Sequence, residues 1–383
     1  MQDPARKRDI VFSYANAIVG RRKEVASRMT HHIVAIGQLP PPLNGFSLAT
    51  GEMVTLLSEA GNVTVCNIGP PSGKLSLLKH PIRFIRVLGA CLQLFRDRKR
   101  GEPTCYLACD GGLGLIYTSL VVLVARLLAC RIELHHHSFS YIHRPMLLMR
   151  CTLAFGGGRL RHIFLCDVMR DRFTDTYQRR TSCSIVSNAA FVMPMETPDI
   201  PKDRTHLTIG MLSNLTPEKG LDTFIALARQ ARAEGLQIKA VLAGPAGKVE
   251  RFAIDTAVAD LGCALDYRGP LYGEAKVSFY RDIDVFVFPT TYDNEAQPLV
   301  IFEAKAAGNA VLSYDRGCIK KQLDEHDLLV PANGEFVPTA LAWLSALLPE
   351  PAREPRREAI RQAYRDRHAK ARAAASAVFD WHR

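Results

Sequence analysis

Short apolar runs typical of β-strands alternate along this chain with stretches of helical patterning, and this alternation limits the possible folds more than any other feature. Six runs lie in the first half of the chain, at 32–37, 62–69, 104–110, 131–137, 162–167 and 183–188. Five more follow a proline-bearing stretch, at 206–212, 238–244, 264–269, 284–289 and 309–314. Strands that alternate with helices form parallel sheets covered by helices. The sequence therefore predicts an α/β protein with two domains of one kind.

The length of the chain supports this division, because 383 residues exceed one ordinary core. We place the domains at 29–195 and 196–350. Residues 1–28 form a basic leader without the apolar core of a signal peptide, and we expect it to be disordered. Residues 351–383 are expected to form a basic helix, and its return to the first domain is left open.

Composition narrows the class of partner. The chain has the 48% hydrophobic and 23% charged residues of a soluble globular protein, and its formal net charge is +11. That charge favours an anionic partner: a nucleotide, a phospholipid surface or a nucleic acid. Its ten cysteines are scattered without a C-x-x-C pair, which predicts reduced thiols in a cytosolic protein and no zinc site.

Two apolar segments raise the question of membrane contact. Residues 113–130 are long enough to suggest a span, but Arg126 interrupts them, and we interpret them as a buried helix. Residues 75–100 combine an apolar stripe with basic side chains that could face an anionic bilayer. The preferred alternative is a helix with its apolar side in the core and a solvated basic side. The basic residues are Lys79, Arg83, Arg86, Arg96, Arg98, Lys99 and Arg100.

The segment 294–304, NEAQPLVIFEA, places a carboxylate in an otherwise apolar helix. Pro298 suits the first turn and Gly308 suits the end, which predicts about ten residues of helix. An ionised carboxylate on such a packing surface needs a partner, and Lys305 points to a different face. We therefore expect a ligand to bind Glu303.

A strand predicted at 284–289 directly precedes this helix. Its unbroken apolar run ending in proline is typical of a strand covered on both faces of a parallel sheet. The connecting loop carries Glu295 beyond the strand's carboxyl end, where doubly wound folds bind ligands. Glu295 and Glu303 could thus hold two parts of one ligand.

Two further loops suit an anionic ligand. In 212–228 a helix is predicted to start near Lys219, and a lysine in a first turn opposes the helix dipole unless an anion lies beside it. A phosphate would fit there, and a solvated lysine is the alternative. In 40–57, Gly45 and a helix N-terminus would allow close approach to a ligand, although an ordinary loop explains them equally well.

The histidine cluster His135, His136 and His137 does not predict a metal site. Adjacent residues of a strand alternate sides and seldom converge on one ion. We expect a polar wall in which one imidazole donates to a ligand oxygen.

The remaining motifs argue against other classes of enzyme. Asp282 and Asp284 resemble a metal-binding D-x-D pair, but they lie at the amino end of their strand and are assigned to strand entry. Residues 111–117 fall short of G-x-G-x-x-G, and the chain has no G-x-x-x-x-G-K-[ST] motif. Dehydrogenase and P-loop kinase functions therefore lose their best support.

In combination, these segments resemble the retaining family 4 glycosyltransferases of the GT-B fold. The most specific match is the E-x7-E pattern of Glu295 and Glu303. Supporting matches are EKG at 218–220, AGP at 243–245, RG at 268–269, the early P-x-x-x-G loop, the histidines and VSN at 186–188. The resemblance implies two Rossmann-like doubly wound domains that face each other across a cleft.

The resemblance also implies roles for individual residues. Glu303 would take the ribose hydroxyls of the donor nucleotide. Lys219 would neutralise the leaving diphosphate, and His137 would contact the sugar, with His135 and His136 still open. Glu295 and the segment after it would address the donor sugar; that segment is Ala296, Gln297, Pro298 and Leu299. The other donor-binding candidates are Gly45, Ser213, Asn214 and Gly244.

The chain departs from the family pattern in two places. Many members carry an arginine where this chain has Ser213, so Asn214 or another group must compensate. Ala296 and Gln297 replace the usual glycines, so the sugar specificity cannot be carried over.

The resemblance implies a retaining, metal-independent hexosyltransferase that needs no cofactor. It would move a sugar from a nucleotide-diphosphate sugar to a hydroxyl of a lipid-linked or polysaccharide acceptor, as in the synthesis of lipopolysaccharide and other cell-envelope polysaccharides. We expect it in the cytoplasm or on the inner face of the membrane, with an anionic membrane surface as an open partner and no nucleic acid. The alternatives are a nucleotide-sugar epimerase of the same fold and a non-enzymatic protein that binds an anionic surface or nucleic acid.

Overall fold

The computed structural model describes residues 32–71, 78–99, 101–195, 206–347 and 353–379. The predicted leader at 1–28 lies outside the described residues. The chain divides into two compact units: the second is Ser187–Arg372, and the first holds the remaining residues. The sequence placed this division at residue 196 instead.

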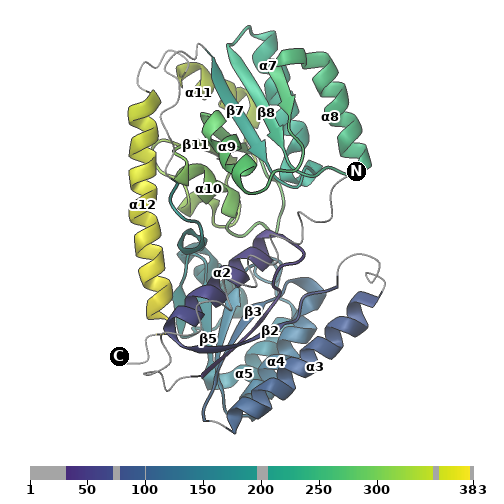
Figure 1. The fold of residues 1–383 in the computed structure, drawn as a ribbon, viewed down its shortest axis with the longest axis vertical. Helices are drawn as coiled ribbons and strands as arrows, with labels where there is room; N and C mark the ends of the chain where they lie inside the picture. The colour runs from purple at the N-terminus through teal and green to yellow at the C-terminus, as the bar shows by residue number, and fades with distance from the viewer. Residues whose placement is uncertain (1–31, 72–77, 100, 196–205, 348–352, 380–383) are drawn as a thin grey trace. The chain divides into compact units, whose positions relative to one another are not determined.

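A parallel six-stranded sheet forms the centre of the first unit (Figure 1). Its strands are β1 (His32–Gly37), β2 (Asn62–Asn67), β3 (Thr104–Cys109), β4 (Arg131–His136), β5 (Leu160–Phe164) and β6 (Cys183–Ile185). Its helices are α2 (Gly45–Ala60), α3 (Lys79–Arg98), α4 (Leu115–Leu127), α5 (Leu147–Gly156) and α6 (Asp167–Tyr177). The strand order is β2-β1-β3-β4-β5-β6, so the direction of winding reverses beside β1. Such a reversal opens a crevice at the carboxyl ends of the strands.

The second unit repeats this design (Figure 1). Its strands are β7 (Leu207–Leu212), β8 (Ile238–Ala243), β9 (Leu265–Tyr267), β10 (Val285–Phe288), β11 (Ala310–Tyr314) and β12 (Leu328–Val330). Its helices are α7 (Leu221–Ala233), α8 (Lys248–Leu261), α9 (Glu274–Asp282), α10 (Leu299–Ala306), α11 (Phe336–Leu347) and most of α12 (Arg353–Ala377). The order β12-β11-β10-β7-β8-β9 makes β7 and β10 neighbours at the reversal point. The prediction of two parallel sheets wrapped by helices is confirmed.

Burial explains why the apolar runs become strands. Every residue of β3 and of β10 is buried, as expected for strands covered on both faces. Several predicted strands have other bounds in the structure, and one strand was missed. The strand predicted at 162–167 starts earlier, at Leu160, and ends at Phe164, since α6 begins at Asp167. The short strand β12 was not predicted, because three apolar residues give too little pattern.

The predicted C-terminal helix exists as α12, and its basic residues hold it to the second sheet. Arg357 is buried and donates to the carbonyl oxygens of Ile283 at 2.6 Å and Ala307 at 3.2 Å. Arg353 lies 3.7 Å from the buried Asp284 carboxylate. Part of the basic character of this helix therefore serves packing.

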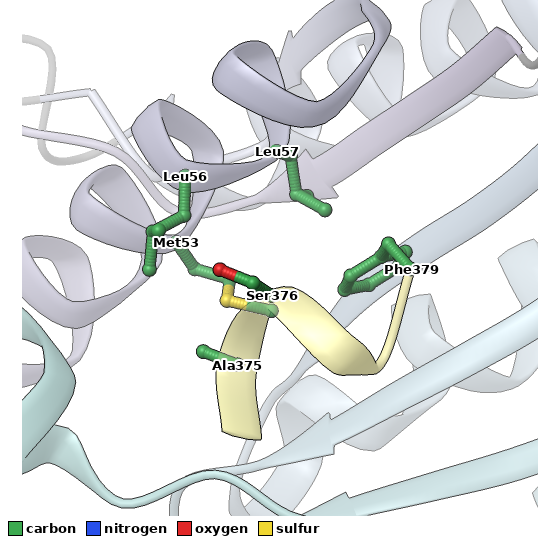
Figure 2. Close-up of a pocket in the computed structure, with 6 residues that line it drawn as sticks. All are labelled: Met53, Leu56, Leu57, Ala375, Ser376 and Phe379. Atoms are coloured by element: carbon green, nitrogen blue, oxygen red, sulfur yellow. The ribbon is translucent and has the colours of Figure 1, made fainter. Parts of the chain in front are cut away.

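The end of the chain packs in the first unit. Figure 2 shows a shallow apolar pocket between α2 and the end of α12; its lining residues are Met53, Leu56, Leu57, Ala375, Ser376 and Phe379. No charged group lines it, so it is not the site expected from the sequence. Among the helices that the structure describes, none is both long and apolar enough to cross a membrane. The segment 113–130 forms the helix α4, much of it buried, followed by β4.

The prediction of ten reduced thiols is wrong for Cys166 and Cys318, which are not free thiols. The other eight cysteines are free, as predicted. They are Cys66, Cys91, Cys105, Cys109, Cys130, Cys151, Cys183 and Cys263.

Candidate active site

Lys219 and Glu295 form an ion pair at the carboxyl ends of β7 and β10, beside the reversal point of the second sheet. The Nζ of Lys219 donates to Glu295 Oε2 at 2.5 Å, and Thr290 Oγ1 donates to the same oxygen at 3.2 Å. The Lys219 ammonium also lies 4.6 Å from the ring centre of Tyr292. The lysine side chain is 24% exposed and the glutamate 10%, so the pair is partly shielded from water while still within reach of a ligand.

The turn that carries Lys219 is a 3-10 helix, Pro217–Lys219, and not the first turn of α7 as predicted. Thr216 caps this turn, because its side chain accepts from the N–H of Lys219 at 3.3 Å. Gly220 then adopts a φ of +92°, and a Cβ there would lie 2.3 Å from the carbonyl oxygen of Pro289. The chain needs a glycine at this position before α7 can start.

The segment 296–299 is fixed by bonds from other loops. The N–H of Asn188 donates to Gln297 Oε1 at 2.7 Å, and Asn188 Nδ2 donates to the carbonyl oxygen of Gln297 at 2.8 Å. The N–H of Cys318 donates to the carbonyl oxygen of Ala296 at 2.8 Å. The side chain of Gln297, a donor-binding candidate, is therefore already hydrogen-bonded to the VSN segment. The backbone of 296–299 remains as the part of this segment that could bind a donor.

The N-terminus of α10 carries no side-chain cap. Pro298, predicted in the first turn, occupies the cap position instead, and Leu299 begins the helix. The cap residue makes no side-chain hydrogen bond to the first turn, and that turn holds no acidic residue. The first N–H groups of a helix lack partners within it and attract anions. This end of α10 can therefore bind a phosphate or a sugar oxygen.

Glu303 has two protein partners that the sequence did not reveal. The Nζ of Lys276 donates to Oε1 at 2.5 Å, and the Tyr280 hydroxyl donates to Oε2 at 2.9 Å. Both come from α9, and the glutamate side chain is 13% exposed. The expectation that only a ligand could supply its partner is wrong. Lys276 and Tyr280 are four residues apart and share a helix face, but no local pattern shows which side chain they meet.

The candidates Ser213, Asn214 and Gly244 lie at the same edge of the second sheet. Gly244 has a φ of +131°, and a Cβ there would lie 1.7 Å from the carbonyl oxygen of Ser213. The glycine is therefore required by packing of the two loops. Asn214 is exposed, and the N–H of Ser213 donates to the carbonyl oxygen of Ala243 at 3.2 Å.

In the first unit, two of the three clustered histidines are used inside the fold. His135 Nδ1 and the Tyr106 hydroxyl share a hydrogen bond of 2.8 Å. His136 bonds through Nδ1 to the Tyr141 hydroxyl at 2.9 Å and through Nε2 to His162 at 2.8 Å. Both side chains are buried, and His136 has both ring nitrogens engaged, whereas His135 Nε2 has no hydrogen-bond partner within the described residues.

His137 is the half-buried member of the cluster. Its Nε2 is buried and has no hydrogen-bond partner within the described part of the chain. Its ring centre lies 4.0 Å from that of His135 and 5.1 Å from that of Phe46 in α2. Burial lowers the pKa of His137 to about 3, so the imidazole is neutral near pH 7. Gly45 directly precedes Phe46, and a Cβ on it would meet open space.

The structure thus brings Lys219 and Glu295 together, and it separately brings Gly45 near His137. The Asp282 and Asp284 pair serves the fold, as assigned: Asp282 pairs with Arg268 at 2.5 Å, and Asp284 accepts the N–H of Thr208 at 2.8 Å. Within the residues described, no three His, Cys, Asp or Glu side chains are placed to hold a metal ion.

Sequence reasoning missed Asp110, which follows β3 at the reversal point of the first sheet. This buried carboxylate accepts from Gln38 at 2.5 Å and pairs with Arg83. Burial raises the pKa of Asp110, and Arg83 and Gln38 oppose that shift. Its position directly after a buried strand was the available signal.

Comparison with known proteins agrees with this geometry. Residues 195–366, somewhat less than half of the chain, match the family model described as glycosyl transferases group 1. No curated protein sequence gives a significant match. The matched stretch contains Lys219, Glu295 and Glu303.

Solved structures that are similar to this chain are glycosyltransferases of the GT-B type. HepE of Anabaena, in complex with UDP and glucose, has 15% identity and a TM-score of 0.61, covering 91% of this chain and 99% of its own. Sucrose-phosphate synthase of Thermosynechococcus elongatus has 16% identity and a TM-score of 0.60, covering 92% and 96%. The UDP-forming trehalose-phosphate synthase of Burkholderia vietnamiensis has 13% identity and a TM-score of 0.60, covering 91% and 99%. At such identities the likeness establishes the fold, and the predicted GT-B class is confirmed.

Proposed function

We propose that this chain, with a GT-B fold and a group 1 glycosyltransferase match in its second unit, transfers a sugar from a nucleotide-diphosphate sugar to an acceptor hydroxyl. The observation that carries the proposal is the ion pair of Lys219 and Glu295 at the reversal point of the second sheet. Doubly wound folds bind nucleotides at such points. Solved structures of HepE contain UDP and UDP-glucose, which makes UDP-sugars the first donors to test.

In this mechanism Lys219 exchanges partners. An incoming diphosphate competes with Glu295 for the Lys219 ammonium, and the N–H groups at the start of α10 offer further bonds to the phosphates. Negative charge grows on the diphosphate as the sugar bond breaks, so these fixed positive groups lower the barrier. Glu295, released from the lysine, can then accept from a sugar hydroxyl. Transfer by this route uses no metal ion.

The Glu303 carboxylate can accept further hydrogen bonds from a donor although Lys276 and Tyr280 already bind it. Each carboxylate oxygen can accept two hydrogen bonds, and Lys276 and Tyr280 take one at each oxygen. The remaining lone pairs can accept from the two hydroxyls of a ribose. The neutral His137 can donate or accept one bond at a sugar hydroxyl through Nε2.

The finer parts of the proposal concern stereochemistry and acceptor. We expect retention, with the acceptor hydroxyl attacking from the face that the diphosphate leaves. The acceptor is a lipid-linked or polysaccharide glycan of the cell envelope, such as a lipopolysaccharide precursor, and the enzyme works at the inner face of the membrane. The basic surface of the chain supports an anionic setting.

The experiment is a panel of radiolabelled nucleotide-sugars assayed for binding and for slow hydrolysis without acceptor. Lys219→Ala should lower kcat/KM for the preferred donor about 100-fold, the usual loss when one stabilising group is removed. Lys239→Ala, at an exposed position of β8, is the matched control and should change nothing.

The enzyme proposal fails if no donor binds or turns over. The site assignment fails if Lys219→Ala and Glu303→Ala turn over the donor as fast as the wild type. Conversion of the donor sugar into its epimer without acceptor would favour the epimerase alternative.

A further inference from the structure

Helix α3 turns apolar side chains toward solvent as well as toward the sheet. Val87, Ala90 and Leu94 are buried on its inner side. Its outer side carries a second apolar row, from here on called the outer stripe. The exposed fractions in the outer stripe are 52% for Leu78, 47% for Phe84, 67% for Ile85, 43% for Leu88, 58% for Leu92 and 50% for Phe95. The preferred expectation of a core-facing side and a solvated basic side holds for these residues, but it did not include the exposed apolar row.

The spacing of the outer stripe makes it one continuous surface. Ile85, Leu88, Leu92 and Phe95 follow one another at intervals of three and four residues, which places them on one side of a helix. A soluble protein rarely exposes so many adjoining apolar side chains, and such a surface marks an interaction site.

The start of α4 extends the apolar surface. The Tyr117 hydroxyl of α4 lies 3.5 Å from His80 Nδ1, and Arg83 lies 4.6 Å from the Tyr117 ring centre, so α4 begins beside the N-terminal half of α3 (Figure 1). Leu113, in the 3-10 turn Gly112–Gly114 that precedes α4, is 74% exposed, and Ile116, beside Tyr117 in α4, is 51% exposed. The first unit therefore presents apolar groups from two adjacent elements.

Charge around the outer stripe is positive. Lys79, Arg96 and Lys99 are exposed and, within the described part of the chain, pair with no carboxylate. The Lys99 ammonium lies 5.0 Å from the Phe95 ring centre, at the border of the stripe. The single acidic residue of α3, Asp97, is buried. The helix thus has no exposed carboxylate to repel an anionic surface.

We propose that α3 lies in the surface of an anionic phospholipid bilayer, with the outer stripe among the acyl chains and Lys79, Arg96 and Lys99 at the lipid phosphates. Helices with one apolar face bordered by basic residues bind such interfaces. A nucleic acid would satisfy the charges but leave the apolar groups in water. The inference does not depend on the donor site; combined with the proposed function, it favours a lipid-linked acceptor.

The test is sedimentation of the full chain with vesicles of phosphatidylcholine alone or mixed with phosphatidylglycerol. The double variant Ile85→Ser/Leu92→Ser should weaken binding to the anionic vesicles by at least about tenfold, since each apolar side chain contributes to insertion. The control is Val249→Ser/Phe252→Ser on α8, whose side chains are 79% and 77% exposed but are not continued by further exposed large apolar side chains along that helix. It should bind like the wild type.

A second variant tests the charges without touching the stripe. Arg96→Gln/Lys99→Gln should weaken binding to anionic vesicles about fivefold for each charge removed, and binding to neutral vesicles should stay equally weak. All substituted side chains are exposed, so the circular dichroism spectra should not change.

Three results would overturn the inference. The first is wild-type protein that does not bind anionic vesicles. The second is an outer-stripe variant that binds them as tightly as the wild type. The third is a wild-type dimer, observed without vesicles, that the outer-stripe variant no longer forms. The last result would assign the stripe to a second copy of the chain. Donor hydrolysis by vesicle-free protein is measured in parallel, so failure of the glycosyltransferase proposal is recognised separately.

Discussion

Each glutamate of the E-x7-E pattern has a lysine partner: Glu295 pairs with Lys219 and Glu303 with Lys276. The residue-level argument from the sequence treated the buried acid at 303 as evidence for a nucleoside. Burial of a charge requires a partner, but the physics does not specify that the partner is a ligand. A protein cation and a tyrosine hydroxyl satisfy the same requirement. The evidence for a donor therefore rests on the position of these groups at the strand ends.

Tyr280→Phe should separate orientation of Glu303 from catalysis. Loss of the hydroxyl removes one bond that fixes the carboxylate, so we expect the KM for the donor to rise about fivefold with kcat nearly unchanged. The measurement is steady-state kinetics on the donor identified above. Tyr314→Phe, whose hydroxyl donates to the Gly334 carbonyl oxygen, is the control. An equal effect of both variants on KM would contradict this role.

Glu133 should make stability fall as pH rises. This carboxylate is 1% exposed, and burial raises its pKa from 4.5 to about 7, although Arg161 lies 3.5 Å away. Between these values the folded state keeps a proton that the unfolded state has lost, so the stabilising effect present below pH 4.5 disappears as pH passes 7.

The corresponding variant is Glu133→Gln. It should be more stable than the wild type above pH 7, by roughly 3 kcal/mol, and similar to it below pH 4.5. Urea unfolding across this range measures the difference between the two proteins. The comparison between the two proteins is needed because buried histidines such as His136, whose pKa is lowered by burial, make stability rise with pH. Their effect is the same in both proteins and cancels in the difference. A constant difference at all pH values would contradict the assignment.

At the scale of elements, turns and short helices fix where the chemical groups lie. Lys219 leaves a 3-10 turn, and the glycine after it packs against the loop that follows β10. That loop is bound to the same turn, because the N–H of Thr291 donates to the carbonyl oxygen of Glu218 at 2.9 Å. The contacts between the two loops keep Lys219 and Glu295 at hydrogen-bonding distance from each other.

Gly244→Ala should disrupt the edge of the second sheet. The added Cβ would lie 1.7 Å from the Ser213 carbonyl oxygen in a backbone of φ +131°, so we expect a loss of about 3 kcal/mol or more in the free energy of unfolding. Gly235→Ala is the matched control, with φ +70° and open space around the new Cβ, and should cost about 1 kcal/mol. Denaturant titration compares the two, and equal losses would contradict the clash.

At the scale of the whole molecule, two Rossmann-like units share one C-terminal helix. The helix α12 belongs to the second unit up to Arg372, and the residues after it belong to the first. The buried Arg357 joins α12 to backbone oxygens of the second unit. The end of the chain takes part in the core of the first unit, where the ring centre of Phe379 lies 6.3 Å from that of Tyr106.

Arg357→Ala should destabilise the second unit by about 3 kcal/mol, because two buried carbonyl oxygens lose a charged donor. Arg365→Ala, on the exposed side of α12, should cost less than about 0.5 kcal/mol, since its partner Glu358 is a surface acid. Thermal unfolding followed by calorimetry tests both. The anchoring role of Arg357 is refuted if the two variants unfold at the same temperature.

The periodic pattern of apolar residues determined the two parallel sheets, the helix at α10 and the order of the motifs, because strand and helix formation depend on neighbours along the chain. Pro298 and Gly308 sufficed to bound α10. The short strand β12 and the 3-10 turn at Lys219 were not predicted, because their patterns span too few residues.

Only the tertiary structure decided which side chains meet. The sequence left three histidines open, and folding gave His135 and His136 internal partners. It likewise brought Lys276 to Glu303 from a separate helix and turned the outer stripe of α3 away from the sheet. These outcomes depend on how elements distant in the chain pack against one another, and no local pattern carries that information.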